Sequence, residues 1–460
     1  MPMDAIYPII SHVHSFKTGS LPAPTVSITK RFIFDAIAVM IAGSRAEGCE
    51  AVMKYAGNWS GKPDAIVVGG RRLPAPYAAM VNSMMAHAVE FDDTYEPADV
   101  HAYAVVLPAV LAAAEINPEK SATGRDIIAA AAVGVDISYR LGSAIKTYRG
   151  WQPTSTCGNL AGTLAAGRIA WCERDELHQA AGIAYGLVAG NFQAVVDASL
   201  TKRLQPGFAA RAAVEAVLLA QAGITGARDI LEGTFGFFPL YEAGEYDPLV
   251  LTDGLGTSFL GDRGSMKPYP CCRFCHAAID AALLIVDDCG IISTAGDILE
   301  ADVSLPAETF DYVGRPYSAN APNLRVAAQF SVPYTVASAL MRGKVGLTEF
   351  SLPSIREERV TELARYIAVT PIEAARYGAV TLRVHLKSGR TLERTVEVMK
   401  GEPGNPLSES ELYEKARACI RFGEFPERTV DDLMMWIENL EHEADPLPKL
   451  HSILQARGVS

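Results

Sequence analysis

The sequence has little basic charge and only eight cysteines for its 460 residues. Acidic residues outnumber basic ones by 53 to 41, which gives a formal net charge of -12. Such a surface repels a nucleic-acid backbone, so we expect no nucleic-acid partner. The cysteines are too sparse for a disulfide scaffold and fit reduced thiols in a reducing compartment. The composition therefore predicts a cytoplasmic protein that is not disulfide-rich.

Long apolar runs are missing as well. Pro108 interrupts the apolar segment that begins at Val105, and Asp136 interrupts the one that begins at Ile127. No run therefore reaches the roughly 20 residues that a membrane-spanning helix needs. The N-terminus carries Asp4 early and lacks a basic region ahead of an apolar core, which argues against an export signal. We predict a soluble protein without a membrane partner.

Motifs for the common cofactors are also missing. No G-x-G-x-x-G or phosphate loop follows a strand pattern, and no G-x-S-x-G elbow occurs. Cys272-Arg-Phe-Cys275 is flanked by Cys271 and His276, but no second C-x-x-C supplies the remaining ligands of a metal shell. We therefore expect no cofactor and no metal, and we interpret these cysteines as packed thiols beside His276.

The apolar pattern predicts helices over the first 265 or so residues. Apolar residues recur at helical spacing between Ile28 and Ile41. Thr123 and Asp126 resemble a capping box that opens a helix through Ala144. Small residues are frequent throughout this part, so the predicted helices can approach closely in a compact bundle.

The pattern changes after about residue 300. Apolar and polar residues alternate between Val380 and Val398 around a Ser-Gly turn, which predicts a β-hairpin. Ser408 and Glu411 resemble a second capping box, so helix is expected to return at the end of the chain.

We therefore predict a mainly α fold in which one domain interrupts another. The large all-helical domain is expected to comprise residues 1–267 and 403–460, the two ends of the chain. A smaller α+β lid domain is expected over residues 268–402. A cleft between two such domains is a common ligand site, and we expect the functional site there.

Two histidines bracket a cluster of acids. The histidines are His87 and His101, and the acids between them are Glu90, Asp92, Asp93 and Asp99. Clustered carboxylates between apolar helices raise one another's pKa, and histidines beside them can exchange protons with them, which is typical of general acid–base catalysis. The alternative is a structural cluster that caps a helix and shapes a loop. His276 is considered with the cysteines, and the remaining six of the nine histidines, among them His178 and His451, are interpreted as solvated.

A short basic pair, Lys202-Arg203, precedes a Pro-Gly turn. An anionic substrate on an acidic protein requires local cations of this kind. The alternative is a solvated pair near the end of a helix.

Seven short segments form an ordered series along the chain. They are Ala86-His-Ala-Val-Glu-Phe-Asp-Asp-Thr94, His101 leading to Val106-Leu-Pro-Ala109, Gly150-Trp-Gln-Pro-Thr-Ser155, Thr201-Lys-Arg-Leu-Gln-Pro-Gly207, Asp229-Ile-Leu-Glu-Gly233, Lys267-Pro-Tyr-Pro-Cys-Cys-Arg-Phe-Cys-His276 and Asn405-Pro-Leu407. In this order the segments resemble the MmgE/PrpD family. The resemblance implies a metal-independent enzyme with a helical domain and an α+β lid, a homodimer, and polycarboxylate substrates such as 2-methylcitrate.

The resemblance also implies which residues line the site. They are Glu90, Thr94, His101, Lys202 and His276. Two positions depart from the family pattern. Gln152 stands where many relatives have a histidine, and it cannot shuttle a proton. Glu90 stands where the acid is often Asp.

These residues suggest how a hydroxy-polycarboxylate could be dehydrated. Removal of a proton α to a carboxylate places negative charge on it, so cations must hold that group and an acid must protonate the leaving hydroxyl. We expect Lys202, with Arg203 or Arg273, to hold the carboxylate, and His101 or His276 to transfer protons.

Glu90 is expected to orient a histidine. Asp93, Thr94 and Gln152 are further candidates for substrate binding. Decarboxylation or epimerisation on the same scaffold, and binding of a polycarboxylate without catalysis, are the alternatives. The sequence leaves the choice of base between His101 and His276 open.

Overall fold

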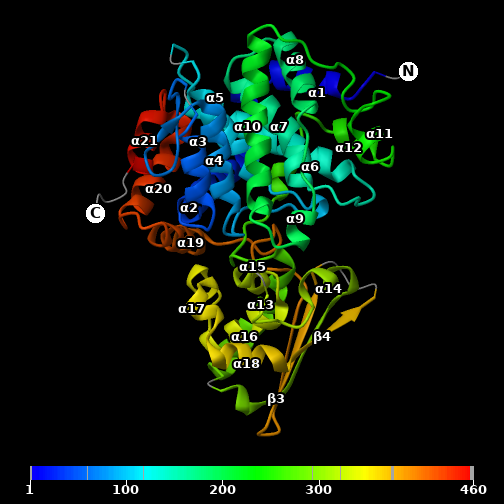
Figure 1. The fold of residues 1–460 in the computed structure, drawn as a ribbon, viewed down its shortest axis with the longest axis vertical. Helices are drawn as coiled ribbons and strands as arrows, with labels where there is room; N and C mark the ends of the chain where they lie inside the picture. The colour runs from blue at the N-terminus through cyan, green and yellow to red at the C-terminus, as the bar shows by residue number, and fades with distance from the viewer. Residues whose placement is uncertain are drawn as a thin grey trace. The chain divides into compact units, whose positions relative to one another are not determined.

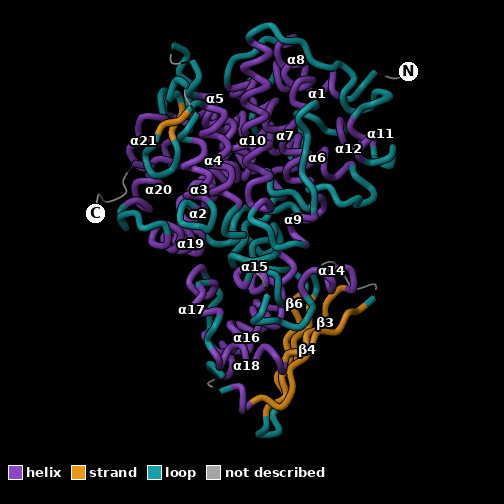
Figure 2. The backbone as a smooth tube through the Cα atoms, in the orientation of Figure 1, coloured by secondary structure: helices purple, strands orange, loops and turns teal. Residues whose placement is uncertain are grey.

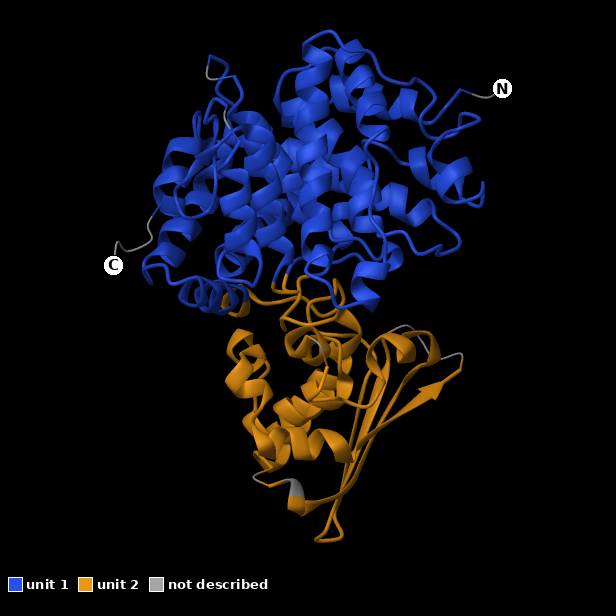
Figure 3. Cartoon of the chain, in the orientation of Figure 1, with its two compact units in different colours: residues 1–88, 92–265, 412–460 blue, residues 89–91, 266–411 orange. Residues whose placement is uncertain are grey.

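The structure of the protein is a computed structural model that describes residues 3–59, 61–117, 119–292, 294–321, 323–373 and 378–455. The chain forms two compact units (Figure 3). Unit 1 comprises residues 1–88, 92–265 and 412–460, and unit 2 comprises residues 89–91 and 266–411. Helices dominate unit 1 and a four-stranded sheet lies in unit 2 (Figure 2), so the predicted mainly α fold with a small α+β part is confirmed.

Unit 1 is built from helices and one short hairpin (Figure 1). Its elements are α1 (Ile6–Ser15), α2 (Ala23–Gly43), α3 (Cys49–Ala56), β1 (Ala65–Ile66), β2 (Arg72–Leu73), α4 (Ala75–His87), α5 (Tyr103–Ala114), α6 (Gly124–Ala144), α7 (Pro153–Ile169), α8 (Arg174–Tyr185), α9 (Gln193–Val196), α10 (Thr201–Gln221), α11 (Phe237–Tyr241), α12 (Pro248–Thr252), α20 (Thr429–Asn439) and α21 (Leu447–Gln455). Helix α19 (Glu409–Phe422) begins where unit 2 ends.

Small residues let the central helices of unit 1 approach closely. Every residue of α5 is buried, and α5 packs against α4, α6 and α7. A Cβ atom on Gly134 of α6 would lie 2.7 Å from Val106 of α5. A Cβ atom on Gly207 of α10 would lie 2.6 Å from the carbonyl oxygen of Met80 on α4. The compact bundle that the Ala- and Gly-rich composition predicts is therefore confirmed.

The predicted capping box at the start of α6 is present. The backbone N–H of Asp126 donates to Thr123 Oγ1 at 3.2 Å, and the N–H of Thr123 donates to Asp126 Oδ2 at 3.0 Å. Helix α6 is long and apolar enough to cross a membrane. However, 94% of its most apolar stretch is buried within the protein, as in the core helix of a globular unit.

Unit 2 is a mixed sheet packed against helices. Its elements are α13 (His276–Cys289), β3 (Ile298–Pro306), α14 (Ala307–Val313), α15 (Leu324–Gln329), α16 (Val332–Arg342), α17 (Leu352–Ile355), α18 (Glu358–Tyr366), β4 (Ile367–Ile372), β5 (Val380–Leu386) and β6 (Thr391–Val396). The strand order is β4-β3-β5-β6, with β3 parallel to β4 and the other neighbours antiparallel. Alternate residues of β5, including Leu382 and Val384, join α13 and α16 in the core.

The predicted hairpin is confirmed as β5 and β6. Leu386 N–H donates to the carbonyl oxygen of Arg390, and Gly389 adopts φ +84°, a left-handed conformation that glycine accepts without strain. The second predicted capping box is also present, since Ser408 N–H donates to Glu411 Oε2 at 2.8 Å and Glu411 N–H donates to Ser408 Oγ at 3.2 Å. We predicted an inserted domain over 268–402. Unit 2 extends over 266–411 and also includes Val89–Phe91.

Candidate active site

The loop between α4 and α5 carries the predicted acid and histidine cluster, and Asp93 anchors this loop. Asp93 is 2% exposed, and its carboxyl accepts hydrogen bonds from the N–H of Tyr103 at 3.2 Å and from the hydroxyl of Tyr139 at 3.1 Å. Burial, with a further contribution from Asp92, raises the pKa of Asp93 to about 8. Asp93 therefore performs the structural role that the sequence left open, since it satisfies the first N–H of α5.

His101 is held by its backbone and its ring. Its N–H donates to Thr154 Oγ1 at 3.0 Å, which ties the loop to the first turn of α7. Its Nδ1 lies 2.5 Å from the carbonyl oxygen of Asp93. Because a carbonyl oxygen can only accept, Nδ1 carries the hydrogen and Nε2 of the neutral ring carries the lone pair. This geometry makes Nε2 the proton-accepting atom of His101.

Asp92 lies between the two histidines. Its Oδ2 is 2.7 Å from Nδ1 of His87 and 3.6 Å from Nδ1 of His101, and the two rings are 5.1 Å apart between centroids. The ligand-type atoms of these three residues lie within 4.8 Å of one another, as a metal site would require. At 2.7 Å, however, His87 and Asp92 are in direct hydrogen-bond contact, which a metal ion would have to replace.

Lys202 lies in the first turn of α10, at the same end of unit 1 as the last turn of α4. Between them lies Gly48, where a Cβ atom would be 3.2 Å from the side chain of Met84 and 3.3 Å from that of Leu200. Arg203 is buried, and its Nη1 donates to the carbonyl oxygen of Glu47 at 3.4 Å.

Hydrogen bonds link the start of α10 to the start of α7. The amide of Gln205 pairs with the backbone of Asn191 at 2.5 and 3.0 Å. The neighbouring Gly190 accepts a hydrogen bond from Gln152 N–H at 3.2 Å, and Gln152 precedes α7. The side chain of Gln152 is buried and accepts from Ser155 Oγ at 2.6 Å.

The N-termini of α5, α7 and α10 therefore lie at one end of unit 1. Helix α5 begins two residues after His101, which bonds to the first turn of α7. Each helix N-terminus carries partial positive charge, so this end of the unit favours an anion with several negative groups.

In unit 2, Glu90 contacts Lys267, which the sequence analysis did not assign to the site. Glu90 adopts φ +56°, a left-handed conformation that a residue with a side chain seldom occupies. Lys267 is 1% exposed, donates to the carbonyl oxygen of Glu90 at 3.2 Å, and lies 3.8 Å from its carboxylate. The position of this lysine in the Pro-rich segment before the cysteines was the only feature of the sequence that could have indicated it.

His276 is fully buried at the start of α13. Its Nδ1 accepts from Arg273 Nη1 at 3.1 Å, and its Nε2–H donates to the carbonyl oxygen of Cys271 at 3.4 Å. Arg273 also donates to the carbonyl oxygen of Lys400 at 2.9 Å. Both ring nitrogens of His276 thus participate in hydrogen bonds within unit 2, in the tautomer with hydrogen on Nε2.

The neighbouring thiols are buried. Burial raises the pKa of Cys272 to about 12 and that of Cys275 well above its usual value. Such thiols stay protonated at neutral pH when no metal ion is bound, as expected for thiols packed in a core. All eight cysteines of the chain are free.

Six predicted site residues lie in unit 1 and three in unit 2. The first group comprises Asp93, Thr94, His101, Gln152, Lys202 and Arg203, and the second comprises Glu90, Arg273 and His276. Within unit 1, Thr94 pairs through its backbone with Ser265 at 3.0 and 2.8 Å, next to Asp93. A common cavity for both groups remains a prediction.

The solvated interpretation was wrong for three histidines. His12 and His451 are half-buried, and the Nε2 atom of each is buried. His178 is 8% exposed rather than solvated, because α8 buries it and its Nε2 donates to the carbonyl oxygen of Arg228 at 3.0 Å.

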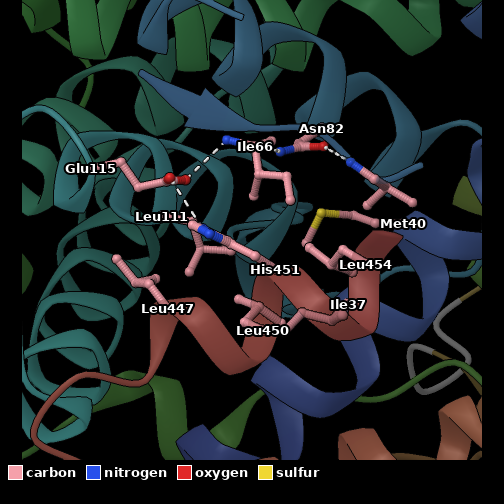
Figure 4. Close-up of a pocket in the computed structure, with 11 residues that line it drawn as sticks. Ile37, Met40, Ile66, Asn82, Leu111, Glu115, Leu447, Leu450, His451 and Leu454 are labelled. Carbon is pink, nitrogen blue, oxygen red and sulfur yellow. Dashed lines mark hydrogen bonds and ion pairs between the residues drawn. The ribbon is translucent and has the colours of Figure 1, made fainter. Parts of the chain in front are cut away.

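Unit 1 also contains a small cavity away from the predicted site residues. Side chains of α2, α4, α5 and α21 surround it, with Asn82 and Glu115 among its polar groups (Figure 4). Its volume of about 10 Å³ suits one water molecule and no substrate. None of the predicted site residues lines it.

Comparison with known proteins gives matches along most of the chain. Residues 8–248 match the MmgE/PrpD N-terminal domain, and residues 269–434 match the MmgE/PrpD C-terminal domain. The cis-aconitate decarboxylase of Aspergillus terreus (strain NIH 2624 / FGSC A1156) is 28% identical over 455 residues, 92% of this chain and 91% of that protein. The cis-aconitate decarboxylase of Homo sapiens is 28% identical over 450 residues, 94% of this chain and 91% of that protein.

Proposed function

This chain belongs to the MmgE/PrpD family, and from that premise we propose that it is a lyase acting on a small polycarboxylate. The observation that carries the proposal is the arrangement of His101 and the N-termini of α5, α7 and α10 at one end of unit 1. The helix N-termini and Lys202 favour an anion with several carboxylates, and Nε2 of His101 can accept or return a proton.

In the first form of the reaction, a hydroxy-polycarboxylate such as 2-methylcitrate loses water. Nε2 of His101 takes the proton from the carbon α to a carboxylate, the electron pair forms the double bond, and the hydroxyl leaves with a second proton as water. Lys202 holds the carboxylate on which negative charge develops. His276 is the candidate acid, and this role requires the imidazolium form. Its Nδ1 would have to give up the hydrogen bond from Arg273 and take up a proton, and its Nε2–H would have to turn from Cys271 to the leaving hydroxyl.

Decarboxylation is a second candidate, favoured by the names of the relatives. An unsaturated tricarboxylate would lose CO₂ as the carbon–carbon bond breaks and its electron pair moves into the adjacent double-bond system. One proton then adds to carbon. This course needs a single proton-transferring group, and His101 alone suffices for it. The same cations would stabilise the charge that develops.

Turnover of a substrate panel tests both forms. The purified protein would be incubated with 2-methylcitrate, citrate, cis-aconitate and iminodisuccinate and followed by proton NMR. Dehydration yields an unsaturated product without release of CO₂, decarboxylation yields CO₂, and epimerisation in D₂O exchanges the α proton. Binding by calorimetry without turnover would favour the non-catalytic alternative. If the protein neither turns over nor binds any of these compounds, the proposal is contradicted.

We also propose that the protein is a cytoplasmic homodimer. The eight free cysteines support a reducing compartment. Exposed apolar side chains on unit 1, including Val196, Phe235 and Leu249, support burial against a second copy. Light scattering of the purified protein tests the dimer, since a mass of one chain, 49.3 kDa, would contradict it.

A further inference from the structure

His87 is fully buried at the last residue of α4 and contacts the predicted proton-transfer site through Asp92. Its Nδ1 lies 2.7 Å from Asp92 Oδ2, so Nδ1–H donates to that oxygen. Among the residues that the structure describes, Nε2 of His87 is buried and has no hydrogen-bond partner. A buried imidazolium would leave a charged N–H unsatisfied at this atom, so the neutral ring with hydrogen on Nδ1 fits the site.

Asp92 connects this ring to His101. Its Oδ2 is 3.6 Å from the Nδ1 of His101, which carries the hydrogen bonded to the Asp93 carbonyl oxygen. A carboxylate on this side of the ring favours the tautomer with hydrogen on Nδ1 and stabilises the imidazolium that forms when Nε2 accepts a proton. The orientation of Asp92 therefore affects proton transfer at the far side of the His101 ring.

We propose that His87 is a positioning residue for His101. Its Nδ1–H fixes the carboxylate of Asp92 where it faces the Nδ1–H of His101, and this leaves the Nε2 of His101 as the atom that exchanges protons with substrate. The catalytic part of this inference rests on the proposed function. The effect on the tautomer and titration of His101 does not.

Other ionisable groups surround Asp92 and His101 and could contribute to the pH dependence of activity. Asp93 lies next to Asp92 in the sequence. Asp35 of α2 also interacts electrostatically with Asp92. Asp35 is neutralised by Lys415 of α19 at 2.7 Å. Tyr139 of α6 bonds to Asp93. None of these groups is changed by substitution of His87, so a shift in the pH profile of a His87 variant reports on Asp92 and His101.

Two substitutions separate positioning from simple packing. His87→Asn keeps an N–H close to the position of Nδ1, whereas His87→Phe fills the space without a donor. Ser83→Ala is the matched control, because Ser83 is buried one turn earlier on α4. Each variant is measured as the full chain, by the pH dependence of kcat/KM and by nitrogen-15 NMR of the histidine rings.

In His87→Phe, Asp92 loses a donor and its charge acts more strongly on His101. We expect the acidic limb of the kcat/KM profile to move to higher pH and kcat to fall about tenfold or more, with little change in KM. The NMR titration of His101 should move in the same direction. His87→Asn should restore most of the activity and of the profile, and Ser83→Ala should resemble the wild type.

Three results would overturn the inference. The first is equal loss in both His87 variants with an unchanged pH profile, which indicates a packing role. The second is a His101 ring protonated on Nε2 in the neutral wild type. The third is stoichiometric zinc or iron in the purified protein that is absent from His87→Asn. If the wild type turns over none of the substrates, the proposed function fails, while the NMR titration still decides the role of His87.

Discussion

At the scale of residues, Lys202 is the sharpest test of the anion site. Lys202→Ala removes a cation that we expect to hold the carboxylate on which charge develops, so kcat/KM should fall about a hundredfold or more. The melting temperature should hardly change, because the side chain is half-buried in the first turn of α10. Lys54→Ala, at an exposed lysine of α3, is the control and should leave both quantities unchanged. Retention of most activity in Lys202→Ala would remove Lys202 from the site.

The sequence predicted which residues gather around His101 but not which contacts they make. The acids and histidines are close in sequence, so their proximity could be predicted. The pairing of Asp92 with His87, and of Asp93 with the first N–H of α5, depends on the path of a buried loop. That path includes the left-handed conformation of Glu90, which no local pattern indicates.

At the scale of elements, local sequence patterns predicted the features that depend only on neighbouring residues. The capping boxes before α6 and α19 and the hairpin of β5 and β6 depend on residues a few positions apart, and all are confirmed. The attachment of α21 depends on distant groups. His451 of α21 lies 3.1 Å from Glu115, at the end of α5, and no local pattern pairs two residues so far apart in the sequence.

This attachment predicts a pH dependence of stability. Burial raises the pKa of Glu115, but hydrogen bonds from His451 and from the N–H of Ile66, with the charge of Arg72, outweigh it and lower the pKa below its ordinary value of 4.5. A lowered pKa in the folded state contributes stability above about pH 4.5 that is lost as pH falls through the folded value. Glu115→Gln should therefore reduce the free energy of unfolding at pH 7, and its difference from the wild type should shrink below pH 4.5.

Urea unfolding at several pH values measures this difference. Glu119→Gln is the control, since Glu119 is an exposed acid shortly after α5. A destabilisation by Glu115→Gln that stays constant down to pH 3 would contradict the electrostatic explanation.

At the scale of the whole molecule, the sequence predicted an interrupted helical part with an α+β part between its segments. It did not indicate that Val89–Phe91 groups with unit 2. Gln329 donates to the carbonyl oxygens of Val89 and Pro270 at 3.2 and 3.0 Å. Contacts over so many residues leave no periodic trace in the sequence.

At the same scale, we expect the whole protein to be active without a bound metal ion. The thiols of Cys272 and Cys275 are packed in the apolar core of unit 2, and His87 and Asp92 are hydrogen-bonded to each other at 2.7 Å. Dialysis of the full protein against EDTA and phenanthroline is therefore expected to change neither kcat/KM on the substrate identified from the panel nor the thermal melt. Dialysis against buffer alone is the control. Loss of activity that zinc or iron restores would instead assign a metal to these residues, since thiols packed in a core and a carboxylate hydrogen-bonded to a histidine cannot account for such a result.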